Sequence, residues 1–329
     1  MTSIPHGGVL INKMININDI KSQELISTCH YEIELNERQL CNVECIMNGA
    51  FSPLQGFMNE IEYNSVVNDM KFKCNTNNTN ESVLFGLPIV FDIINQDDII
   101  KMIPGNRILL KYKHMSIAIF NIDSQYIPNK VIEAQKCYNT TSIEHPAVYM
   151  ITAERGNVYC GGEIIGLNKP LRDVPCRTPI EVRKDLVDYF EQLELKQQAT
   201  TTTTTSTNTA ISRDVVAFQC RNPIHKAHYE LILRALKAPN VSSNAVVLLH
   251  PTVGPTQKDD ISGYLRYQTY IKLKEEVSNP KLFWDYLAYN MHMAGPREAL
   301  QHMIIRKNYG CTHFVIGRDM AGCKSSLTG

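Results

Sequence analysis

The sequence lacks an excess of charge of either sign. Its 329 residues include 33 lysines and arginines and 33 aspartates and glutamates, so the formal net charge is zero. Proteins that bind nucleic acids or membrane surfaces usually carry a basic patch or stripe, and nothing in this composition marks one. We therefore expect no nucleic acid and no membrane among the partners. A local group of arginines could still hold a small anion, which net charge does not reveal.

Long hydrophobic runs and paired cysteines are missing too. No run approaches the roughly 18 uninterrupted apolar residues of a membrane span. The ten cysteines include no CxxC pair, so they resemble neither a zinc site nor a redox motif. Residues 1–8 show no basic segment and no apolar run, so no secretory signal is expected. These absences favour a cytoplasmic protein with free thiols and no protein-bound metal.

The composition is that of a globular protein, with 43% hydrophobic and 20% charged residues, and the length indicates two domains. Residues 1–170 are predicted to form a β-rich domain of short strands, for example at 83–91 and 107–112, separated by Gly, Pro and Asn turn signals. Residues 171–329 are predicted to form the second domain.

The second domain is expected to open with a helix from Pro179 to about residue 198, capped by Thr178. The threonine-rich stretch 199–210 that follows is interpreted as an insertion, since its β-branched residues disfavour a helix and have no apolar partner face.

A regular alternation of strands and helices begins after this stretch. Strands are predicted at 215–218, 246–249, 283–287 and 313–316, and helices at 223–236, 260–277 and 296–308. This β-α-β order implies an α/β domain with a parallel sheet and right-handed crossovers. Ligands of such sheets lie beyond the carboxyl ends of the strands. The chemistry is therefore predicted in the turns after Phe218, Leu249 and Ile316.

The first of these turns combines an arginine with a predicted helix start. Asn222 can cap the helix and Pro223 fits its first position. A helix N-terminus favours phosphate, and His225 and His228 share one face of the first turn. Arg221 can clamp an oxyanion in bidentate fashion. Two exposed polar histidines are the alternative, but their position behind a buried strand favours phosphate binding.

The other two turns supply further charge. The loop 250–260 ends in one lysine and two aspartates, at 258–260, which either cap the next helix or shape the site indirectly. The turn 317–322 begins and ends with glycine, which permits close backbone approach to a ligand. Arg318 adds a second guanidinium there, unless it is a structural partner of Asp319. Together the turns indicate a reaction of anions that depends on charge stabilisation.

These turns resemble the motifs of the ATP sulfurylase (sulfate adenylyltransferase) family. The family pattern Gln-Thr-Arg-Asn-Pro-x-His-x-Ala-His is met at 219–228 except for Cys220, and Gly-Arg-Asp-His-Ala-Gly at 317–322 except for Met320. Further family motifs are met at 5–8, 49–58, 250–254 and 294–299. The resemblance covers essentially the whole chain, although relatives continue with a further C-terminal subdomain that this sequence is expected to lack.

The resemblance implies a PUA-like N-terminal domain followed by a Rossmann-like (HUP-type) nucleotidylyltransferase domain. It implies the reversible reaction of ATP and sulfate to adenosine 5′-phosphosulfate and pyrophosphate, by in-line attack of sulfate on the α-phosphate. It also implies Mg²⁺ bound with ATP and a homo-oligomeric assembly. The alternatives are a nucleotidylyltransferase of the same fold with another acceptor and, disfavoured by the neutral charge, an RNA-binding protein.

The resemblance also assigns roles to residues. Sulfate would be held by Gln219, Arg221 and the backbone of Ala321. The catalytic residues would be Arg221, Asn222, His225, His228 and Arg318. ATP would be bound by these five together with Gln219, Cys220, Gly317, Asp319 and Met320. Two of these positions depart from the family: Cys220 removes a hydroxyl, and Met320 removes an imidazole that could stack on adenine.

Overall fold

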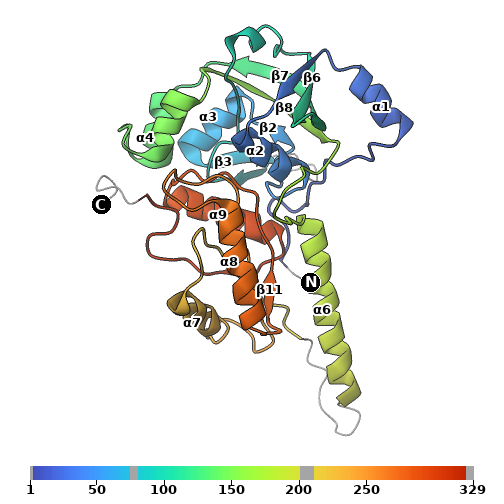
Figure 1. The fold of residues 1–329 in the computed structure, drawn as a ribbon, viewed down its shortest axis with the longest axis vertical. Coiled ribbons are helices and arrows are strands. Elements are labelled where there is room, and N and C mark those ends of the chain that lie inside the picture. The colour runs from blue at the N-terminus through green and yellow to red at the C-terminus, as the bar shows by residue number, and fades with distance from the viewer. Residues whose placement is uncertain (1–2, 75–80, 201–210, 324–329) are drawn as a thin grey trace.

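The computed structural model describes residues 3–74, 81–200 and 211–323. An N-terminal domain built on a six-stranded sheet lies against a C-terminal domain built on a four-stranded sheet (Figure 1). Within the described ranges no helix is both long and apolar enough to cross a membrane. The division at residue 170 stays a prediction.

The N-terminal sheet is mostly antiparallel. Its strands, in sheet order, are β1 (Tyr31–Glu34), β6 (Arg107–Tyr112), β7 (Met115–Tyr126), β8 (Val158–Gly166) and β2 (Gly56–Phe57), with β5 (Phe91–Ile93) also paired to β8. Only β1 and β6 run parallel among these pairs. A separate hairpin joins β3 (Lys71–Cys74) to β4 (Glu81–Leu84). The predicted strand at 107–112 is therefore confirmed.

The single strand predicted at 83–91 is wrong. Strand β4 ends at Leu84 and β5 begins at Phe91, with a buried loop between them. Pro88 cannot donate to a strand ladder. Gly86 lies so close to the Arg297 carbonyl that a Cβ there would be 2.3 Å from that oxygen. This loop thus leaves its sheet to pack on the second domain.

Helices of the N-terminal domain begin with side-chain caps in several cases. They are α1 (Ile20–Ser27), α2 (Glu37–Met47), α3 (Glu60–Asp69), α4 (Lys130–Tyr138) and α5 (Pro146–Tyr149), with a 3₁₀ turn at Gln96–Asp98 and a π turn at Met150–Glu154. Asn36 and Asn59 each form a capping box with the residue three positions on, Gln39 and Glu62. These boxes fix where α2 and α3 begin.

The C-terminal sheet is parallel throughout, as predicted. Its order is β11 (Leu282–Trp284), β10 (Val246–Leu249), β9 (Val215–Phe218) and β12 (His313–Phe314). Its helices are α7 (Lys226–Ala235), α8 (Gly263–Glu276) and α9 (Pro296–Asn308). The outer strands β11 and β12 are shorter than predicted. The predicted helix at 296–308 is confirmed.

Two predicted helix starts are wrong by about one turn. Helix α7 begins at Lys226 rather than Pro223, and α8 follows Ser262, whose side chain accepts the amide of Leu265. The carbonyl of Asn222 instead accepts the Tyr270 hydroxyl at 3.0 Å, so the chain bends there before it becomes helical.

Helix α6 (Pro179–Thr200) begins where it was predicted. Thr178 and Glu181 exchange hydrogen bonds between their side chains and backbone amides in a capping box. Figure 1 shows that its last turns extend away from the rest of the molecule. The predicted insertion at 199–210 is corrected at its start, because Thr200 is still helical; residues 201–210 lie outside the described residues.

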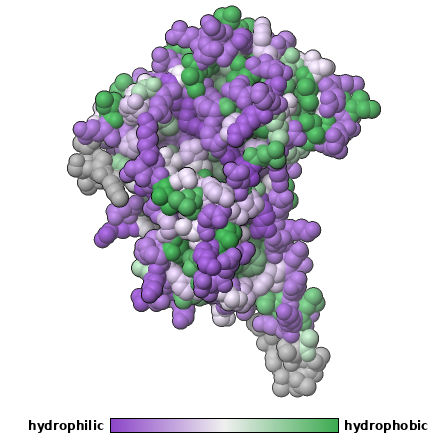
Figure 2. Space-filling model, viewed as in Figure 1, coloured by the Kyte–Doolittle hydropathy of each residue, from purple (hydrophilic) through white to green (hydrophobic). Residues whose placement is uncertain are grey.

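The two domains share one continuous hydrophobic core. Asn308 on α9 donates its side-chain amide to the carbonyls of Ala50 and Ser52, each at 3.0 Å. The Phe51 ring meets Tyr289 edge-on, with 6.1 Å between centroids. The outer face drawn in Figure 2 is mostly hydrophilic, with only small separate hydrophobic groups. This shared core holds the two sheets in a fixed relation around the site described below.

A buried ion pair ties the helical side of the N-terminal domain together. Glu133 on α4 and Arg155 lie 2.9 Å apart with side chains 0% and 1% exposed. Tyr63 donates its hydroxyl to the other oxygen of Glu133 at 2.9 Å. Removing one partner of such a pair leaves the other charge buried without compensation.

Arg155→Met is expected to lower the free energy of unfolding by about 3 to 5 kcal/mol, measured by denaturant titration. The matched control is Arg213→Met, which breaks the more exposed Arg213–Glu194 pair and should cost less than about 1 kcal/mol. Equal losses in both variants would contradict this assignment.

Candidate functional site

The backbone pairing of β9 and β10 continues past the ends of the two strands. The amide of His250 donates to the carbonyl of Phe218, and that of Thr252 to Cys220, both at 2.9 Å. Because β12 pairs with β9 on its other side, the turns after the three strands lie next to one another along the carboxyl edge of the sheet. This is the arrangement that the strand order predicted.

Arg221 lies at this edge with its guanidinium largely buried. The Nη1 atom is 3.3 Å from Asp260 and 2.8 Å from the Met293 sulfur, and the side chain is 15% exposed. Within the described residues its other N–H groups make no hydrogen bond. The guanidinium is thus oriented on one side and open to an oxyanion on the other.

The Tyr270 hydroxyl forms hydrogen bonds with the residues on either side of Arg221, Cys220 and Asn222. The Cys220 thiol donates to the buried Tyr270 hydroxyl at 3.7 Å, and that hydroxyl donates to the Asn222 carbonyl at 3.0 Å. Burial raises the pKa of the Cys220 thiol to about 12, so it is neutral. The side chain at position 220 therefore faces the protein interior, which explains why a cysteine can stand where the family has threonine.

The start of α7 has no capping side chain. His225 is the N-cap residue but makes no capping hydrogen bond, so the amides of the first turn remain available. The His225 and His228 rings stack with centroids 3.8 Å apart. Burial lowers the pKa of His228, and the neighbouring His225 lowers it further. The histidine pair and the open amides lie at one helix end, as expected of an anion-binding helix start.

The third turn is more exposed than the first. The Arg318 side chain is 93% exposed and lies 3.4 Å from Asp319, the structural pairing that was the alternative interpretation. Gly317 is also exposed, whereas Met320 is half-buried. The Ala321 carbonyl accepts the amide of Gly295 at 3.0 Å, which joins this turn to the loop before α9.

Backbone strain gathers where these two loops meet. Met293 and Ala321 have φ values of 56° and 55°, in the left-handed region that non-glycine residues rarely adopt, and Gly295 has 54°. For the two non-glycine residues such conformations cost of order 1 kcal/mol or more each, whereas glycine adopts them freely. Met293 is also the residue that contacts Arg221.

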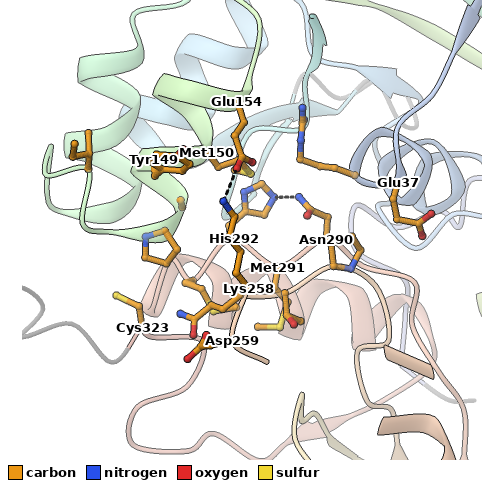
Figure 3. Close-up of a pocket in the computed structure, with 18 of the residues that line it drawn as sticks. Glu37, Tyr149, Met150, Glu154, Lys258, Asp259, Asn290, Met291, His292 and Cys323 are labelled. Carbon is orange, nitrogen blue, oxygen red and sulfur yellow. Dashed lines mark hydrogen bonds and ion pairs between the residues drawn. The ribbon is translucent and has the colours of Figure 1, made fainter. Parts of the chain in front are cut away.

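A cavity of about 830 Å³ opens between the two domains beside Met293. One wall comes from segments of the N-terminal domain and the other from the loops at 255–259 and 290–293. Figure 3 shows Lys258 and Glu154 joined across it, 3.4 Å apart. The buried His292 and Asn290 lie at its floor, 3.5 Å apart. The lining therefore mixes apolar side chains, such as those of Met150 and Met291, with charged and polar ones.

None of the eleven residues assigned to the site from sequence lines this cavity. Of the loop singled out at 250–260, only its second half does so, at 255–259. The missed lining comes from segments far apart in the chain, so no local motif could reveal it. Arg221 borders the cavity through Met293.

Metal-ligand chemistry is not evident at this edge. Among the residues that the structure describes, no group of three or more His, Cys, Asp and Glu side chains could hold a metal ion.

Comparison with known families covers most of the chain. The family model for a PUA-like domain matches residues 3–169, and the ATP-sulfurylase model matches residues 194–327. The chain belongs to the ATP-sulfurylase family. Its N-terminal PUA-like domain and α/β second domain thus confirm the predicted fold class.

Sulfate adenylyltransferases of fungi are similar to this ATP-sulfurylase family chain over nearly its whole length. The Debaryomyces hansenii protein is 37% identical over 99% of the chain, and the Yarrowia lipolytica protein 39% over 98%. The Saccharomyces cerevisiae protein is 37% identical over 97% of the chain. The chain covers 59%, 52% and 57% of these proteins, so it spans just over half their length.

A solved structure shares the fold. The hexameric APS kinase from Thiobacillus denitrificans matches with a TM-score of 0.68 at 21% identity, over 97% of this chain and 53% of that one. The arrangement of both domains in this ATP-sulfurylase family chain therefore recurs in a solved protein.

A buried carboxylate shapes the loop that carries Met293. Glu298, in the first turn of α9, accepts the amides of His292 at 2.8 Å and Ala294 at 3.0 Å. Burial raises the pKa of Glu298 to about 7, against the opposing effect of these hydrogen bonds. A carboxyl whose pKa is raised on folding stabilises the fold below its unfolded pKa, and this contribution is lost as pH rises through the folded value.

Glu298→Gln removes this titration. Between pH 5 and pH 8 the unfolding free energy of the parent chain should fall by roughly 2 to 3 kcal/mol relative to that of the variant. Denaturant unfolding of both proteins at the two pH values measures the difference. If the difference in unfolding free energy between the parent chain and the variant is the same at both pH values, the raised pKa of Glu298 is contradicted.

Proposed function

We propose that this chain carries the catalytic site of a sulfate adenylyltransferase, which joins ATP and sulfate into adenosine 5′-phosphosulfate and releases pyrophosphate. The observation that carries the proposal is Arg221. It lies in the turn after β9, oriented by Asp260 at 3.3 Å, and this turn leads into the uncapped start of α7 at Lys226. A guanidinium and a helix N-terminus at one sheet edge suit two anionic substrates that must approach each other.

In this proposal sulfate binds to Arg221, the Gln219 side chain and the backbone of Ala321. The Nε2 atom of Gln219 is buried and has no hydrogen-bond partner in the described part of the chain, which supports such a role. An unpaired buried amide is costly, and an oxyanion would accept its hydrogen bond.

ATP is proposed to lie across the same edge. Asn222 and Arg318 would bind its phosphates, and His225 and His228 the departing pyrophosphate, beside the open amides of α7. Mg²⁺ would enter bound to the nucleotide phosphates. The turn with Gly317, Asp319 and Met320 would contact adenosine, with backbone contacts in place of imidazole stacking.

A sulfate oxygen would attack the α-phosphorus in line as the bond from that phosphorus to the β-phosphate bridging oxygen breaks. Sulfate is already an anion at neutral pH, so no general base is required. The barrier arises from bringing two anions together, and fixed positive groups lower it by positioning and charge stabilisation. The proposal includes the reverse reaction, a cytoplasmic location and a homo-oligomeric assembly.

Arg221→Ala is expected to reduce sulfate-dependent pyrophosphate release by about 100-fold or more, because a preorganised cationic donor is lost. The matched control is Arg234→Ala on α7, where Arg234 is exposed and, among the described residues, pairs only with Glu230; it should keep parental activity. Circular dichroism checks that both variants are folded.

Full activity in Arg221→Ala would refute the site assignment. Pyrophosphate release that requires a different acceptor, with sulfate inert, would refute the reaction and favour a related nucleotidylyltransferase. A folded parent chain that releases no pyrophosphate would refute the proposal for this chain by itself.

Cys220→Thr restores the family residue. Because the side chain at position 220 faces the Tyr270 hydroxyl rather than the open edge, this change should alter kcat/KM for sulfate by less than about threefold, or about 0.6 kcal/mol. Steady-state assays of pyrophosphate release measure it. A tenfold or larger gain would show that the usual hydroxyl contacts substrate after all.

A further inference from the structure

Two arginines lie buried beneath the turn that carries Arg221. Arg266 on α8 is 1% exposed and Arg306 on α9 is 0% exposed. Neither forms an ion pair within the described residues, and the Nε atom of each has no hydrogen-bond partner there. Burial lowers the pKa of Arg306 to about 10, which leaves it charged at neutral pH. Both are therefore buried cations without a carboxylate.

Arg155, the other arginine that is buried among the described residues, is compensated by a carboxylate, and so are the less deeply placed Arg38 and Arg172. Arg155 pairs with Glu133, Arg38 with Asp92 and Arg172 with Glu44, at 2.9, 2.8 and 2.6 Å. An uncompensated buried charge is expensive, and apolar residues often replace buried charges without loss of stability. Packing alone therefore does not account for two guanidinium groups at this place.

Their hydrogen bonds connect them directly to the candidate site. Arg306 donates to the carbonyl of His250 at 2.7 Å, and Arg266 to that of Thr252 at 3.3 Å. These are the two residues whose amides donate to the carbonyls of Phe218 and Cys220. Each guanidinium thus hydrogen-bonds to a residue whose own amide extends the backbone pairing of β9 and β10 toward Arg221.

The charges also reach the turn electrostatically. Burial raises the pKa of the Cys220 thiol, while Arg306 and Arg266 both oppose this rise. Burial lowers the pKa of Arg266, the charge of Arg221 lowers it further, and Asp260 opposes both effects. Asp260 is the carboxylate that pairs with Arg221, and the two buried arginines add cations without ion-pair partners among the described residues.

We propose that Arg266 and Arg306 are positioning residues that determine anion specificity: their uncompensated charges make the Arg221 turn select a doubly charged tetrahedral oxyanion over a singly charged one. This inference rests on the proposed function, since it assumes that Arg221 binds the oxyanion. Neither arginine touches the substrate.

The physical basis is the dependence of Coulomb energy on ligand charge. A fixed cation stabilises a dianion by twice the energy with which it stabilises a monoanion at the same place. Removing the cation should therefore weaken dianion binding by about the square of the factor that applies to the monoanion. Buried charges are also screened little by salt.

The test titrates sulfate and perchlorate, which are both tetrahedral, into the full chain by calorimetry at constant ionic strength. Arg306→Met and Arg266→Met should weaken sulfate about tenfold and perchlorate only about threefold. Arg306→Lys and Arg266→Lys keep the charge and should restore the sulfate preference. Arg297→Met is the matched control, since Arg297 donates to the carbonyls of Val66 and Val67 in the other domain.

Equal weakening of both anions in the methionine variants would overturn the inference and leave a purely structural role. Loss of the sulfate preference in folded lysine variants would overturn it as well, even if the methionine variants do not fold. Because ATP is absent, the test is separate from turnover. A parent chain that prefers sulfate but makes no pyrophosphate refutes the proposed function only; a parent that binds both anions equally refutes the inference.

Discussion

Thr252 donates its amide to the Cys220 carbonyl one step beyond the last paired residues of β9 and β10. This extra rung keeps two turns together that would otherwise separate where the strands end. Arg221 follows immediately, and its guanidinium contacts Asp260 and Met293. Tyr270 holds the same turn from beneath. The position of the candidate site depends on this short stretch of backbone.

The two domains differ in how they use buried charge. In the N-terminal domain, buried guanidinium groups are matched with carboxylates, as in the pair of Arg155 and Glu133. Beneath the carboxyl edge of the second sheet, the described partners of Arg266 and Arg306 are carbonyl, hydroxyl and imidazole groups. The first arrangement compensates the charge within the fold, whereas the second leaves positive potential for a ligand. This difference agrees with the proposed anion site in the second domain.

Prediction from sequence was accurate where local pattern and tertiary structure agree. The apolar strands at 215–218 and 246–249 have no other stable place than the middle of a sheet, and the Thr178–Glu181 capping box fixes the start of α6. It failed where distant groups compete for the backbone. The Tyr270 hydroxyl donates a hydrogen bond to the Asn222 carbonyl, and α7 starts three residues later than its cap signal indicates. The local sequence pattern likewise did not predict that the Arg318 side chain is exposed.

The sequence by itself determined the parallel sheet, the order of its elements and the three turns that face one edge, because hydrophobic periodicity and turn residues act over a few positions. Only the tertiary structure decided what those turns contain in space. It turned Cys220 inward, placed Arg266 and Arg306 beneath the site, and opened the cavity between the domains. These features arise from contacts between residues far apart in the chain, whose geometry follows from packing and has no local signal.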